Sequence, residues 1–89
     1  MAYKIVLIED DPLIAEDLRS KLTSLGYQVV GTGYKKNKIL TLVENHGPDI
    51  IIADIMLEGQ EYDGIDLVNE IYKQYKVPVI YLTANSESL

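Results

Sequence analysis

The chain has 89 residues and a formal net charge of −6, with 47% hydrophobic residues, 25% charged residues and no cysteine. This length fits one domain, residues 1–89, and the lack of cysteine excludes disulfides and thiolate metal sites. The acidic balance argues against direct binding to nucleic acid. No apolar run is long enough to cross a membrane and no secretory signal pattern is present, so we expect a cytoplasmic protein without a membrane partner.

Four short apolar runs rich in β-branched residues are spread along the chain. They do not alternate with polar residues, which is typical of strands buried on both faces of a parallel sheet. The runs cover residues 5–8, 29–30, 50–53 and 79–82. We therefore expect four parallel strands.

Helical patterns separate these runs. The first predicted helix has Asp11 as its cap and Pro12 as its first residue, and it ends at Gly26. The second is stopped by the sequence HGP at residues 46–48, and the third starts near Asp63 and Gly64 and ends before residue 78. The apolar positions of the three helices are Ile14, Leu18, Leu22 and Leu25; Ile39, Leu40 and Val43; and Ile65, Val68, Ile71, Tyr72 and Tyr75.

Alternating strands and helices predict an α/β fold with right-handed crossovers, in which the carboxyl ends of all strands meet at one edge of the sheet. Glu9 and Asp10 follow the first strand, Asp54 follows the third and Thr83 follows the fourth. Clustered carboxylates are tolerated where a cation offsets their repulsion. Oxygen ligands suit Mg²⁺, and a carboxylate beside it can attack phosphorus, for which Asp54 is the best placed residue.

Other polar residues have simpler interpretations. Asp11 is best explained as a helix cap, and His46 lies in the last turn of its helix, where a cation is favoured by the dipole. The sequence GTG at residues 31–33 is incomplete as a phosphate-binding motif, and we interpret it as a turn. Lys35, Lys36 and Lys38 form a local basic cluster that a solvated helix start explains.

Four motifs together resemble those of response-regulator receiver domains of two-component signalling. They are KIVLIEDDP at residues 4–12, DIIIADIML at 49–57, DG at 63–64 and PVIYLTA at 78–84. The resemblance covers the whole chain and implies a flavodoxin-like three-layer sandwich with a parallel sheet of order 2-1-3-4-5. It also implies a conformational switch in a phosphorelay, with a sensor histidine kinase as partner.

The resemblance assigns roles by position. Asp54 corresponds to the phosphoacceptor, Asp10 to the direct Mg²⁺ ligand and Glu9 to its partner, acting through water. The backbone carbonyl of Met56 would complete the protein ligands. Thr83 corresponds to the switch hydroxyl that moves toward the phosphoryl oxygens.

The chain departs from the family pattern in two places. Residues 55–63 are slightly longer than the usual loop and contain no proline. No residue matches the family's lysine at the end of a fifth strand, and that strand and the last helix are absent from these 89 residues. We therefore expect an exposed fourth strand at residues 79–82, which would favour a homodimer or the exchange of elements.

Two other functions remain open on the sequence alone. Without the lysine, the chain would be a phosphorylation-incompetent fragment that acts only as a protein-interaction module. A hydrolase with an aspartyl-phosphate intermediate would need the pattern Asp-x-Asp, but Met56 stands where the second aspartate of that pattern would be. The main prediction is thus a non-enzymatic phosphoacceptor domain.

Overall fold

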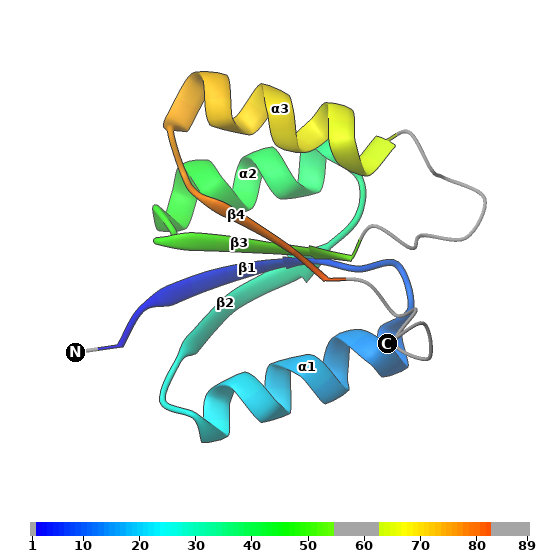
Figure 1. The fold of residues 1–89 in the computed structure, drawn as a ribbon, viewed down its shortest axis with the longest axis vertical. Helices are drawn as coiled ribbons and strands as arrows, with labels where there is room; N and C mark the ends of the chain where they lie inside the picture. The colour runs from blue at the N-terminus through cyan, green and yellow to red at the C-terminus, as the bar shows by residue number, and fades with distance from the viewer. Residues whose placement is uncertain (1, 55–62, 83–89) are drawn as a thin grey trace.

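A computed structural model describes residues 2–54 and 63–82. For residues 54 and 63–68 it describes the backbone but not the side chains. In this part of the chain strands and helices alternate (Figure 1). They are β1 (Lys4–Ile8), α1 (Pro12–Ser24), β2 (Gln28–Gly33), α2 (Lys36–His46), β3 (Ile50–Asp54), α3 (Asp63–Tyr75) and β4 (Val79–Leu82). The predicted order of elements is confirmed.

The four described strands form one parallel sheet in the order β2-β1-β3-β4. Figure 1 shows α1 on one face of this sheet and α2 and α3 on the other, so the molecule has three layers. The α/β class, the three layers and the order 2-1-3-4 are therefore as expected. No helix in the described ranges is long and apolar enough to span a membrane.

The central strand β1 is buried on both faces, which explains its unbroken apolar run. Val6 and Ile8 point to the α2 and α3 side, where they meet buried residues of α2, β3 and α3. Ile5 and Leu7 point to the α1 side and pack with Ile52 of β3. Burial of this kind is the main favourable contribution to the free energy of folding.

The ends of the helices follow local chemistry. Asp11 caps α1, because its Oδ1 accepts hydrogen bonds from the backbone amides of Leu13 (2.9 Å) and Ile14 (3.4 Å). Gly47 ends α2 in the left-handed conformation, with φ of 55°. Both signals were readable in the sequence.

Gly31 and Gly33 are strand residues, and the interpretation of residues 31–33 as a turn is wrong. They belong to β2 and pair with Val6 and Ile8 of β1. A Cβ atom at Gly31 would lie 2.4 Å from Cδ2 of Leu42, so glycine lets α2 approach the strand closely. The reason for these glycines is packing between elements.

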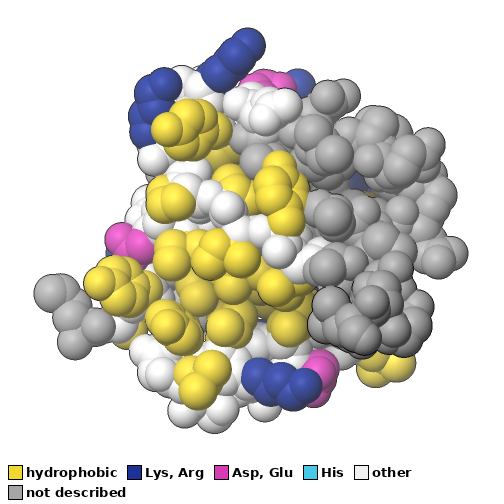
Figure 2. Space-filling model, viewed as in Figure 1, with side chains coloured by type: hydrophobic (Ala, Val, Ile, Leu, Met, Phe, Trp, Pro, Cys, Tyr) yellow, Lys and Arg dark blue, Asp and Glu magenta, His cyan; other side chains and the backbone are white. Residues whose placement is uncertain are grey.

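The sheet is covered unequally. Helix α1 packs on β1 and β2, while Ile80 of β4, which shares a face with its register partner Ile52, is 48% exposed. Hydrophobic side chains gather on this face, between β4 and α1 (Figure 2). Ile14 of α1 is 44% exposed, so the apolar face predicted for this helix is only partly buried.

Candidate functional site

The site begins where β1 and β3 end side by side. Ile8 and Ala53 are register partners in the parallel pairing of these strands. The next residue on each strand is acidic, Glu9 after β1 and Asp54 at the end of β3. Neighbouring strands run about 4.8 Å apart, so the fold places these two residues next to each other at the carboxyl edge.

Glu9 is a buried residue that forms hydrogen bonds through both its side chain and its backbone. Its side chain is 5% exposed, and its Oε2 accepts a hydrogen bond from the backbone amide of Asp11 at 3.0 Å. Its own amide donates to the carbonyl of Gly33 on β2 at 2.8 Å. Glu9 therefore connects the end of β1 to the start of α1 and to the end of β2.

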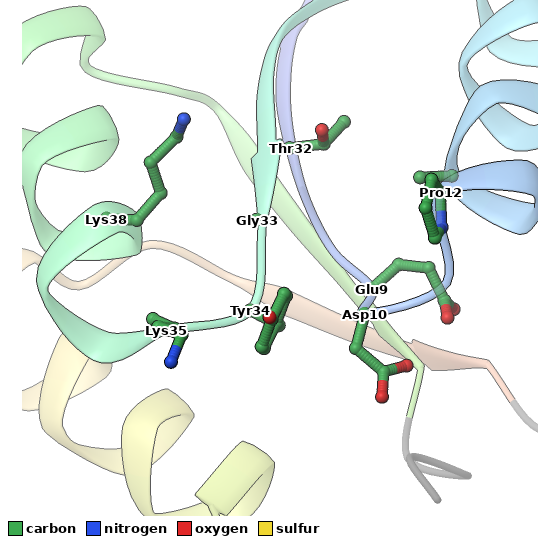
Figure 3. A pocket seen from close by; sticks show the side chains of 9 residues that line it. Glu9, Asp10, Pro12, Thr32, Gly33, Tyr34, Lys35 and Lys38 are labelled. Carbon is green, nitrogen blue, oxygen red and sulfur yellow. The ribbon is translucent and has the colours of Figure 1, made fainter.

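A cavity of about 380 Å³ opens beside this edge (Figure 3). Glu9, Asp10 and Pro12 lie on one side of it, and Lys35 and Lys38, from the start of α2, lie on the other. Asp10 is half-buried, so its carboxylate is accessible to a ligand. The cavity thus has an acidic wall and a basic wall.

The described residues fit the magnesium site that the resemblance implies only in part. Glu9 and Asp10 offer carboxylate oxygens, and Mg²⁺ commonly takes one or two protein carboxylates together with water and phosphate oxygens. Among the side chains that the structure describes, which leave out those of residues 54 and 63–68, no group of three or more His, Cys, Asp or Glu forms a metal cluster. The side chain of Asp54, and the predicted site residues Met56 and Thr83, lie outside what the structure describes.

The basic wall was not anticipated from the sequence as part of a site. The lysine cluster divides in space, because Lys36 Nζ forms an ion pair with Glu70 Oε1 of α3 at 2.9 Å. Lys35 and Lys38 instead line the cavity, together with the exposed Tyr34. The only sequence signal was an unusual run of lysines at a helix start.

The comparison with protein families agrees with this geometry. A model of the response regulator receiver domain matches residues 5–89. The chain belongs to this family. Its sheet order is that of the receiver fold.

Relatives of this receiver domain include larger regulators. It is 40% identical, over 88 residues, to the phyllosphere-induced regulator PhyR of Methylorubrum extorquens, covering 98% of this chain and 33% of that protein. It matches the crystal structure of the response regulator PhyR from Brucella abortus with a TM-score of 0.83 and 43% identity, covering 100% of this chain and 36% of the other.

A third relative was solved with a bound protein. The co-crystal structure of the anti-anti-sigma factor PhyR with the anti-sigma factor NepR, from Bartonella quintana, matches with a TM-score of 0.84 and 39% identity. The match covers 100% of this chain and 36% of that one. The receiver domain thus spans about a third of the length of each of these relatives.

Proposed function

We propose that this receiver domain accepts a phosphoryl group on Asp54 and acts as a conformational switch. The observation that carries the proposal is the register of β1 and β3, which brings Asp54 beside Glu9 at the carboxyl edge. The histidine kinase of a two-component system is the proposed donor. In the transfer, an Asp54 carboxylate oxygen forms a bond to phosphorus while the bond from phosphorus to the donor's histidine nitrogen breaks. The donor's other ring nitrogen carries a proton, so the ring keeps the electron pair of the broken bond and leaves as a neutral imidazole.

The acidic pair is proposed to hold Mg²⁺ for this step. Asp10 is half-buried at the cavity and would be a direct ligand, with Glu9 contributing through water and the Met56 carbonyl completing the set. The bound ion would neutralise negative charge on the transferring phosphoryl group. Thr83 follows Leu82, the last residue of β4, and is the proposed switch hydroxyl.

The switched surface is proposed to be recognised by another protein. The PhyR protein of Bartonella quintana, a relative of this domain, was crystallised with another protein, the anti-sigma factor NepR. A partner protein that senses the phosphorylated state is the corresponding proposal for this chain. An interaction module without phosphorylation is the alternative.

A small-molecule phosphodonor tests the proposal directly. With Mg²⁺ present, we expect intact-mass analysis to show an alkali-labile phosphoryl adduct on the 89-residue chain. The adduct should disappear in Asp54→Asn and in Asp10→Asn. It should persist in Asp11→Asn, a matched control that removes one charge from the same loop and keeps the capping oxygen of Asp11.

Either of two results would contradict this function. One is the absence of any adduct on the wild-type chain, which would favour the interaction module. The other is an adduct that survives in Asp54→Asn, which would place the phosphoryl group on another residue.

A further inference from the structure

We propose that Asp11 is a positioning residue for the proposed Mg²⁺ site, and that it links the first turn of α1 to the carboxylate of Glu9. Asp11 is not a metal ligand in this proposal, because it acts on Glu9 through its backbone amide. The inference rests on the proposed function, since it concerns the same acidic pair. It adds a role to a residue that the sequence identifies only as a helix cap.

Asp11 forms hydrogen bonds in two directions. Its amide donates to Oε2 of Glu9 at 3.0 Å. Its carbonyl oxygen accepts from the amide of Ala15 at 2.9 Å, and its Oδ1 accepts from the amides of Leu13 at 2.9 Å and Ile14 at 3.4 Å. The hydrogen bonds that begin α1 and the hydrogen bond that holds Glu9 therefore meet at one residue.

The backbone conformation of Asp11 couples these hydrogen bonds. Asp11 is extended, with φ of −94° and ψ of 115°, and Pro12 follows it as the first residue of α1. A residue before proline is disfavoured in the helical conformation, so Pro12 helps to keep Asp11 extended. The cap fixes the same backbone relative to the first turn. Because rotation of Asp11 would move its amide as well as its carboxylate, loss of the cap should loosen the hydrogen bond to Glu9.

Glu9 is sensitive to the loss of this donor. The residue is 5% exposed, so water has little access to replace a hydrogen bond to its carboxylate. A hydrogen bond to an ionised carboxylate is also stronger than one between neutral groups. The amide of Glu9 remains bonded to the carbonyl of Gly33 at 2.8 Å, so the end of the strand should stay in place. The expected change is thus in the orientation of the carboxylate.

The expected effect on metal affinity is moderate. Removing a group that orients a metal ligand commonly weakens binding by about 10-fold to 100-fold. Loss of the cap leaves the amide of residue 11 in the chain and only frees it to move. We therefore expect a smaller loss of Mg²⁺ affinity, about threefold to tenfold.

The variants Asp11→Ala and Asp11→Asn separate positioning from charge. Both remove the same negative charge, but only asparagine keeps a capping oxygen. A Mg²⁺ titration of the 89-residue chain, followed by nuclear magnetic resonance at the Asp10 amide, should give a dissociation constant about threefold to tenfold higher in Asp11→Ala than in Asp11→Asn.

Val43→Ala is the matched control for lost stability. Val43 is buried in the core beneath α2 and does not line the cavity beside Glu9 and Asp10. Its truncation should destabilise the fold by leaving a cavity, yet the folded protein should bind Mg²⁺ as the wild type does. Thermal melting confirms that each variant is folded at the temperature of the titration.

Two further measurements do not depend on the affinity. Without metal, the amide proton of residue 11 should resonate at low field in the wild type and in Asp11→Asn, as expected for a donor to a carboxylate, and should move upfield in Asp11→Ala. Because coupling is reciprocal, Mg²⁺ should slow hydrogen exchange at the amides of Leu13 and Ile14 in the wild type. This slowing should be smaller in Asp11→Ala.

Each of four results would overturn the inference. Equal Mg²⁺ affinities of Asp11→Ala and Asp11→Asn would leave only a charge effect or a direct ligand role for Asp11. An equal loss of affinity in Val43→Ala would make lost stability the cause. An unchanged amide shift in Asp11→Ala, or exchange at Leu13 and Ile14 that is insensitive to Mg²⁺, would show that the two sets of hydrogen bonds are not coupled.

The proposed function is judged separately. If the wild type binds Mg²⁺ and accepts a phosphoryl group on Asp54, any of these four results removes the positioning role of Asp11 and leaves the proposed function intact. A wild-type chain that does not bind Mg²⁺ would overturn both the proposed metal site and the positioning role.

Discussion

A Cβ atom at Gly31 would lie 2.4 Å from Cδ2 and 2.8 Å from Cδ1 of Leu42. The close approach of β2 and α2 thus depends on the missing side chain. Gly31→Ala should lower the free energy of unfolding by about 1–3 kcal/mol, because the added methyl group overpacks this contact. Urea denaturation measures the change.

A double-mutant cycle identifies the cause. If overpacking is the reason, Gly31→Ala should cost less stability in a Leu42→Ala background than in the wild type. Equal costs in both backgrounds would show that the contact with Leu42 is not responsible.

The cap of α1 gives a second prediction. Asp11→Ala removes the acceptor of the Leu13 amide hydrogen bond and should lower the free energy of unfolding by about 1 kcal/mol. Asp11→Asn keeps an acceptor and should retain most of the stability. The capping role is contradicted if both variants unfold at the same lower denaturant concentration.

The ion pair between Lys36 and Glu70 should contribute little. Its side chains are 58% and 43% exposed, so solvent and salt screen the attraction. A double-mutant cycle with Lys36→Gln and Glu70→Gln should give a coupling free energy below about 1 kcal/mol that falls as salt is added. A larger, salt-independent coupling would mean that the pair organises the contact between α2 and α3.

The stability that the Glu16–Arg19 pair gives to α1 should change with pH in a defined direction. The hydrogen bond from Arg19, and then its charge, hold the pKa of Glu16 below its ordinary value of 4.5. The pair should therefore stabilise the folded state above about pH 4.5 and lose this effect as the pH falls through the lowered pKa of Glu16. A titration of Glu16 followed by nuclear magnetic resonance should show its pKa rise in Arg19→Gln; an unchanged value would refute this cause.

The exposed face of β4 predicts self-association of the 89-residue polypeptide. Ile80 and Tyr81 are 48% and 42% exposed, and the described strands pair with β4 only through β3. Sedimentation velocity should show a dimer that Ile80→Lys weakens. Leu13→Lys, which alters a residue that is 82% exposed on α1, is the control and should leave the dimer intact. A monomer at all concentrations would count against this prediction.

The sequence was sufficient for features that depend on neighbouring residues. The cap at Asp11, the turn at Gly47 and the buried run of β1 each follow from local chemistry, and the structure has all three. The parallel direction of the strands followed from their alternation with helices, and their order was implied by the resemblance to receiver domains. The position of Asp54 at the end of β3 was equally predictable.

Features that depend on distant contacts were missed. In the sequence, the glycines of β2 look like turn residues. Their role is visible only in the structure, where Leu42 and Lys38 of α2 occupy the space that a side chain at Gly31 or Gly33 would need. The division of the lysine cluster depends on Glu70, far along the chain. The exposure of Ile14 could not be read from helical periodicity, which shows which residues share a face but not what covers it.

The hydrogen bonds around Asp10 have a consequence for the entropy of ligand binding. Its neighbour Glu9 is tied to Gly33 through the backbone, and its other neighbour, Asp11, is tied to Glu9 through its amide and to α1 through its side chain. Asp10 is thus held between two fixed residues before any ligand arrives. Little backbone freedom remains to be lost on binding, so an ion at Asp10 would meet a preorganised ligand.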